Sequence, residues 1–211
     1  MSLSLLLVRH GETPWNRERR FQGFSDVPLN ERGMRQACAL ARCLRARQIA
    51  AVYASDLVRA RSTAETIARE HGVEVRVDAR LREMNQGALE GKALEDLLRD
   101  YPGLLERWLA EPAEVRMPGG ESLRCAQDRA WEVVQEIRTA FSEGTIVLVG
   151  HNLCLLAVIC RAVGLDLNHF RRLRIENASI TEILFSGAEA VLLRLNDTRH
   201  LEEQLREDDS R

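Results

Sequence analysis

Five side chains that can bind an anion or transfer a proton lie close to the ends of short apolar runs. They are Arg9 and His10 after the first run, Arg59 and Glu83 after the next two, and His151 after a fourth. Arginine is a planar donor that keeps its charge near neutral pH, which suits the oxygens of a phosphate dianion. A neutral imidazole can attack phosphorus, and a carboxylic acid can protonate the leaving alkoxide. This set predicts phosphoryl transfer through a phosphohistidine, with no metal ion and no cofactor, because the arginines neutralise the charge.

The apolar runs that carry these residues are typical of strands buried on both faces. Residues 3–8, 49–54 and 145–149 are short runs that are apolar almost throughout and do not alternate, as a parallel sheet covered by helices requires. Residues 73–81 alternate, as a half-buried strand does. In such a sheet the carboxyl ends of the strands meet at one edge, where ligands bind. We therefore expect an α/β fold, a three-layer α/β/α sandwich whose central sheet is mostly parallel.

Helical patterns fill the intervals between the predicted strands. Asn30 can cap a helix, and a second helix is expected from residue 57 to 71, ended by Gly72. The apolar face predicted for the first of these helices contains Met34, Ala37, Cys38, Ala41 and Leu44. Three further helices are predicted over residues 93–109, 121–142 and 154–163.

The C-terminal part of the chain predicts an antiparallel hairpin. Residues 179–185 and 190–195 have the composition of strands and are joined by the short stretch "SGAE". The chain has 211 residues without a repeat or a linker, so we expect one domain over residues 1–211. Its charged tail, residues 202–211, is expected to be disordered.

Composition excludes several classes of partner. The net charge of −2 favours neither nucleic acid nor an anionic membrane. The five cysteines include no CxxC pair, which is typical of reduced thiols. The opening "MSLSLLLV" lacks the basic segment and the length of a signal peptide or a membrane span. We expect a cytoplasmic protein that acts on a small phosphorylated substrate, with an edge strand or the hairpin available for a homodimer.

Five separated motifs carry the candidate residues. They are "LVRHGETPWN", "FQGFSDVPLNERGMRQA", "ASDLVRARSTAETI", "LREMNQGALEG" and "VLVGHN". Together they resemble the histidine phosphatase superfamily, in the branch similar to cofactor-dependent phosphoglycerate mutase, over nearly the whole chain. The resemblance implies that His10 is the nucleophile and Glu83 the acid–base residue. It implies that the residues around the phosphate are Arg9, Thr13, Asn16, Gln22, Gly23, Arg59, His151 and Asn152.

The resemblance leaves three functions open. The mutases of this family resemble one another in a longer insertion with a basic pair that grips a carboxylate. Residues 92–120 are a short segment here, and Arg99, Arg107 and Arg116 are dispersed in it, which favours a phosphatase over a mutase. A non-catalytic module that binds phosphorylated ligands is the third reading, and the intact catalytic set disfavours it. Sugar phosphates, phosphoglycerate derivatives, phosphoserine, α-ribazole phosphate and phosphoproteins all stay open as substrates.

Overall fold

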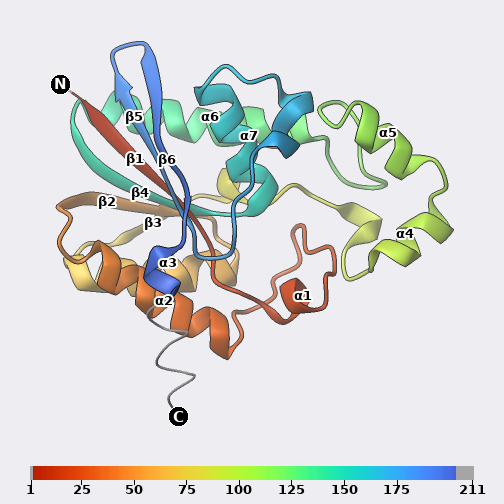
Figure 1. The fold of residues 1–211 in the computed structure, drawn as a ribbon, viewed down its shortest axis with the longest axis horizontal. Helices are drawn as coiled ribbons and strands as arrows, with labels where there is room; N and C mark the ends of the chain where they lie inside the picture. Colours follow the sequence, from red (N-terminus) through yellow and green to blue (C-terminus); the bar gives the residue numbers. More distant parts are fainter. Residues whose placement is uncertain (1, 203–211) are drawn as a thin grey trace.

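The computed structural model describes residues 2–202, which form one six-stranded sheet with helices on both of its faces (Figure 1). The strands are β1 (Leu3–Arg9), β2 (Ile49–Ala54), β3 (Val75–Val77), β4 (Gly144–Gly150), β5 (Ile180–Ser186) and β6 (Glu189–Asp197). Their order is β3-β2-β4-β1-β5-β6, in which the first four are parallel and β5 and β6 are antiparallel. The predicted fold class, with its C-terminal hairpin, is confirmed.

Two pairs of helices cover the sheet. The helices α2 (Glu31–Leu44) and α3 (Val58–His71) lie on one face, and α6 (Leu123–Ala140) and α7 (Asn152–Ala162) lie on the other (Figure 1). Asn30 caps α2, because its side chain accepts a hydrogen bond from the Gly33 amide at 2.8 Å. Gly72 ends α3 in the left-handed conformation, with φ of +62°. Both predicted caps are therefore present.

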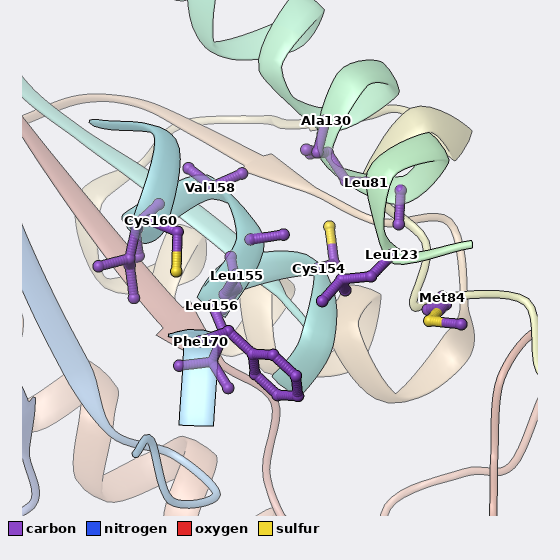
Figure 2. Close-up of a cluster of buried hydrophobic side chains, with 14 of the residues drawn as sticks. Leu81, Met84, Leu123, Ala130, Cys154, Leu155, Leu156, Val158, Cys160 and Phe170 are labelled. Atoms are coloured by element: carbon purple, nitrogen blue, oxygen red, sulfur yellow. The ribbon is translucent and has the colours of Figure 1, made fainter. Parts of the chain in front are cut away.

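Strand β1 shows why the apolar runs are continuous. Its alternate side chains enter two different cores, with Leu5 and Leu7 facing α6 and α7 and Leu6 and Val8 facing α2 and α3. Figure 2 shows the first core, in which the side chains of α7 pack among those of neighbouring elements. The labelled residues there are Leu81, Met84, Leu123, Ala130, Cys154, Leu155, Leu156, Val158, Cys160 and Phe170. Burial of each such large aliphatic side chain stabilises the fold by about 1.5–3 kcal/mol.

The predicted apolar face of α2 is partly wrong. Met34 is 46% exposed and Cys38 is also exposed, whereas Leu40, which the prediction omitted, is fully buried. The buried stripe runs through Ala37, Leu40 and Leu44, so Met34 and Cys38 lie at its border. Spacing alone places a stripe to within one residue, and the neighbour α3 decides which border residues it covers.

Two predicted elements are shorter than expected. The helix over residues 93–109 is divided into α4 (Leu94–Asp100) and α5 (Leu104–Ala110), because Pro102 has no amide hydrogen and Gly103 has φ of +80°. The strand over residues 73–81 is reduced to β3 and a 3-10 helix, Ala79–Leu81, which the Asp78 side chain caps.

Short 3-10 helices, Gly87–Leu89, Leu167–Arg172 and Arg199–Leu201, also occur in the described chain. A short helix α1 (Pro14–Arg17), which the sequence did not predict, follows β1. The predicted disorder of the tail concerns residues that lie, beyond Glu202, outside the described part of the chain. Within residues 2–202, every helix is too short or too polar to cross a membrane.

Candidate active site

Two neighbouring parallel strands bring the two candidate histidines together. Arg9 lies opposite Gly150 in the pairing of β1 with β4, so the residues that follow each strand are adjacent. The His10 amide donates a hydrogen bond to the Gly150 carbonyl at 3.1 Å, and the rings of His10 and His151 have centroids 5.1 Å apart. The strand ends therefore define the spacing of the two imidazoles.

The hydrogen-bond partners assign opposite tautomers to these rings. His10 Nδ1 lies 2.7 Å from the Gly11 carbonyl, which can only accept, so Nδ1 carries the hydrogen and Nε2 has a free lone pair. His151 Nδ1 accepts from Arg59 Nε at 3.2 Å, so in the neutral ring the hydrogen is on Nε2. One ring thus offers a nucleophilic nitrogen and the other offers an N–H donor.

Both imidazoles are held in the neutral form. Burial lowers the pKa of His10 well below its usual range, and the charges of Arg59 and Arg9 lower it further. Burial also lowers the pKa of His151 well below its usual range, with Arg59 as the next cause. A neutral His10 is the form that can attack phosphorus.

Arg59 is a fully buried cation that organises this end of the sheet. It donates to the carbonyls of Ser25 and Gly23 at 2.7 and 2.9 Å, in addition to His151. Burial lowers the pKa of Arg59 to about 10, so the guanidinium stays charged at neutral pH. Three of its N–H groups are engaged with protein, which leaves two for a ligand.

Two further donors at this end are buried and unpartnered. Nε of Arg9 and Nε2 of His151 have no hydrogen-bond partner among the described residues, although Arg9 also donates to the Ile175 carbonyl at 2.8 Å. Burial lowers the pKa of Arg9. Buried donors are nearly always paired in folded proteins, so these two indicate a site for an acceptor such as a phosphoryl oxygen.

Glu83 is held at the N-terminus of α7. Its Oε1 accepts from the amides of Met84 and Cys154 at 2.8 and 3.0 Å, and its Oε2 accepts from the Leu153 amide at 3.2 Å. The dense packing of α7 in Figure 2 keeps these amides in place. Oε2, with one longer hydrogen bond, has fewer protein partners than Oε1 and keeps more of its acceptor capacity for a further hydrogen bond.

Arg129 of α6, which the sequence analysis missed, holds the backbone around Glu83. It donates to the carbonyls of Arg82 and Glu83 at 2.7 and 2.8 Å, and it pairs with Glu121 at 2.6 Å. In sequence Arg129 looks like a surface arginine on a helix. Only the folded structure shows that Arg129 donates hydrogen bonds to backbone carbonyls at and next to Glu83.

Thr13 lies behind the site rather than in it. Its buried hydroxyl caps α1 by accepting from the Asn16 amide at 3.1 Å, and it lies 3.0 Å from Gln22 Oε1. Asn177, also missed in sequence, donates to Asn16 Oδ1 at 3.2 Å and to the His10 carbonyl at 3.1 Å. These contacts orient Asn16 and Gln22, which face the cavity described next.

A cavity of about 350 Å³ opens at the carboxyl ends of the parallel strands. Eight of the ten predicted site residues line what we call its polar end: Arg9, His10, Asn16, Gln22, Gly23, Arg59, Glu83 and Asn152. The other two, Thr13 and His151, lie behind this surface. Much of the opposite wall comes from the cap, which we define as α4 and α5, residues 94–110 (Figure 1).

The fold and the polar end define a class of protein. A neutral histidine, two arginines and a carboxylate line one cavity at the carboxyl ends of the parallel strands, and a second histidine with an unpartnered N–H group lies directly behind them. This set of residue types fits an enzyme that acts on phosphorylated substrates.

Comparison with known proteins places the chain within that class. The family model of the histidine phosphatase superfamily (branch 1) matches residues 5–198. The chain belongs to this family, and the predicted membership and enzyme class are confirmed.

Its relatives carry more than one activity in their names. Phosphoserine phosphatase 1 of Hydrogenobacter thermophilus is 36% identical over 201 residues, which cover 95% of each chain. A probable phosphoglycerate mutase, GpmB, of Salmonella choleraesuis is 36% identical over 86% of this chain and 84% of its own. The solved structure of YhfR from Bacillus stearothermophilus has a TM-score of 0.89 at 32% identity, over 94% of this chain and 99% of that one.

Proposed function

We propose that this protein is a metal-independent phosphomonoesterase that hydrolyses a small phosphorylated metabolite through a phosphohistidine on His10. The observation that carries the proposal is the pair of Nδ1 contacts, His10 with the Gly11 carbonyl and His151 with Arg59, which together imply opposite tautomers at the ends of β1 and β4. That arrangement presents the lone pair of His10 Nε2 beside the N–H group of His151 Nε2, with rings 5.1 Å apart.

In the first step, His10 Nε2 attacks the phosphorus atom as the bond to the ester oxygen breaks. Arg9, Arg59 and the His151 N–H group donate to the phosphoryl oxygens as charge develops on them. The leaving alkoxide takes a proton from Glu83, which must carry that proton when the bond breaks. The products are the alcohol, a phosphohistidine and the Glu83 carboxylate.

In the second step, the Glu83 carboxylate removes a proton from a water molecule. The resulting hydroxide attacks phosphorus, and the bond to His10 Nε2 breaks. Inorganic phosphate leaves, His10 is neutral again, and Glu83 holds the proton needed for the next cycle. Two displacements thus replace one difficult one.

Turnover of p-nitrophenyl phosphate in the presence of EDTA tests this proposal. We expect steady hydrolysis without added metal and an acid-labile phosphoprotein on rapid acid quench, and we expect the phosphoprotein to be absent in His10→Ala. A wild-type enzyme without turnover and without a phosphoprotein would overturn the proposal and favour a non-catalytic binding module.

The surroundings of the cavity favour hydrolysis over a mutase reaction. Of the three dispersed arginines of residues 92–120, none lines the cavity within the described chain. Arg99 pairs with Asp96 and Asp100, and Arg116 donates to the Gly120 carbonyl. A mutase must hold a bisphosphorylated intermediate, which needs further cations. Robust conversion of 3-phosphoglycerate to 2-phosphoglycerate with a bisphosphate primer would reverse this preference.

Three further expectations stay predictions: a single domain, a cytoplasmic location and a homodimer. For the homodimer, β6 is an edge strand that exposes Val191, Leu193 and Leu195, which gives a second copy an apolar surface to bind. Light scattering of the wild type beside Leu193→Lys tests it, since a dimer through β6 should become monomeric in the variant.

A further inference from the structure

The cavity has two chemically different halves. Outside the polar end, its wall includes Arg20 and Gln86 and otherwise consists of large apolar side chains, several of them from the cap. These are Phe21, Leu89, Leu94, Leu97, Leu104, Leu105, Trp108, Met117 and Leu153. An ester whose phosphate occupies the polar end must place its alcohol part against this wall.

The cations near the apolar half already have protein partners. Arg20 is the one charged residue that lines the cavity outside the polar end within residues 2–202, and it donates to Glu18 at 2.6 Å and to the Gly91 carbonyl at 2.7 Å. Lys92 lies nearby in sequence and is paired with Asp100 at 2.7 Å. A carboxylate on the alcohol part would therefore have to compete with Glu18 for Arg20, and the rest of the apolar half would offer it no charge to replace its water.

We propose that the substrate is a phosphomonoester of an uncharged, apolar alcohol, such as an alkyl or aryl phosphate. The inference rests on the proposed phosphatase function and adds its substrate class. Phosphoserine, phosphoglycerates and sugar phosphates present charged or polar groups to the apolar wall and are poor substrates. The cavity volume of about 350 Å³ is at the lower end for small-molecule sites, so the alcohol is small.

The wall contributes binding free energy through burial of apolar surface. Each methylene group that enters an apolar site gains about 0.8 kcal/mol, which is close to a fourfold change in kcat/KM. In a series of alkyl phosphates the reacting phosphorus and the leaving oxygen stay the same. The dependence of kcat/KM on chain length therefore reports binding to the apolar wall and not a change in the reaction itself.

The first experiment measures kcat/KM for ethyl, butyl, hexyl and octyl phosphate. We expect a rise of about threefold to fourfold per methylene until the wall is covered, then a plateau or a decline. Phosphoserine and 3-phosphoglycerate should fall below butyl phosphate. An active enzyme with a flat chain-length profile, or with a preference for either anionic ester, would overturn the inference.

A matched pair of variants on α4 tests whether the cap is the wall that the chain contacts. Leu94 lines the cavity and is 45% exposed, whereas Leu98 is 48% exposed and does not line it. Leu94→Ala should lower kcat/KM for hexyl phosphate by about tenfold and change that for ethyl phosphate by less than about twofold. Leu98→Ala should change neither. Equal effects of the two variants on hexyl phosphate would contradict the assignment.

Binding of non-hydrolysable phosphonates separates the two possible failures. Calorimetry with methyl, butyl and hexyl phosphonate should give affinities that rise about threefold to fourfold per methylene, with or without turnover. If affinity rises in this way but no ester is hydrolysed, the proposed function fails and the inference about the ligand class stands. If esters are hydrolysed but phosphonate affinity is independent of chain length, the inference fails and the function stands.

Discussion

The polar end of the cavity and the cap differ in their residues and in the elements that carry them. The polar end is carried by the ends of β1 and β4 and by the start of α3. Its residues His10, Arg59 and Glu83 are buried, and each is hydrogen-bonded to backbone. The cap consists of two seven-residue helices that stand beyond the sheet (Figure 1). Its residues Leu94, Leu98 and Leu109 are large, apolar and exposed.

This difference suggests that the polar end carries out phosphoryl transfer and that the cap selects among the alcohol parts of the esters. Phosphoryl transfer needs atoms placed within tight limits, and a sheet packed on both faces supplies them. Recognition of an apolar alcohol needs only surface of the right extent, which two short helices can provide. Changes at the polar end should therefore alter the rate for every ester, and changes in the cap should alter the ranking among esters.

Removal of the nucleophile is the largest expected effect and the most direct test of this division. His10→Ala should lower kcat by about 10⁴-fold or more for ethyl and hexyl phosphate alike, because both esters need the same attack. Steady-state kinetics of both esters check it, with Leu98→Ala as a purification control. A variant that keeps activity on one ester would show that the cap also takes part in the chemistry.

Loss of the proton donor should have the next largest effect. Glu83→Gln should slow alkyl phosphates by about 10²-fold or more, because their alkoxides need a proton as they leave. p-Nitrophenyl phosphate has a stable leaving group and should be slowed much less. If both kinds of ester are slowed equally, Glu83 positions the site and does not donate the proton.

The polar end could be predicted from sequence because its residues end recognisable elements. His10 and His151 follow continuous apolar runs, and parallel strands bring their carboxyl ends to one edge. The family motifs then name the same positions. Arg129 could not be found in this way, since its contacts are to backbone carbonyls that only the folded segment brings near it.

The cap could not be predicted because its signals are ambiguous. Leu94, Leu97 and Trp108 have the spacing of a core stripe, and nothing in the sequence distinguishes a residue that lines a cavity from one that fills a core. The pair Pro102 and Gly103 carried the signal for the break between α4 and α5, and the prediction of one helix overlooked it. A proline and a glycine in the middle of a helical pattern end the helix there, even when the apolar spacing continues on both sides.

Acid should destabilise the fold through its buried histidines. His10 and His151 both have a pKa lowered well below the usual value, chiefly by burial, and burial also lowers the pKa of His200. The unfolded chain binds protons to these rings near pH 6.5 while the folded chain does not. Stability is therefore full above that pH and falls as the pH drops below it, by at most about 1.4 kcal/mol per pH unit for each ring.

Urea unfolding between pH 7 and pH 5 measures this dependence. His10→Gln removes one of the titrating rings and should give a shallower fall in the free energy of unfolding than the wild type shows. A stability that is flat over this range would mean that these histidine rings are protonated as readily in the folded chain as in the unfolded one.

The smallest expected effect concerns the break within the cap. Gly103 has φ of +80° and Gly164, at the end of α7, has φ of +69°, and an added Cβ would meet no atom within 4 Å at either position. Substitution by alanine at each should cost only the left-handed backbone conformation, about 1 kcal/mol in the free energy of unfolding. Gly103→Ala should also lower kcat/KM for hexyl phosphate by about twofold, because strain between α4 and α5 loosens the apolar wall. Gly164→Ala should leave kcat/KM for hexyl phosphate unchanged. Equal kinetics for the two variants would mean that backbone strain between α4 and α5 does not affect the preference for hexyl phosphate.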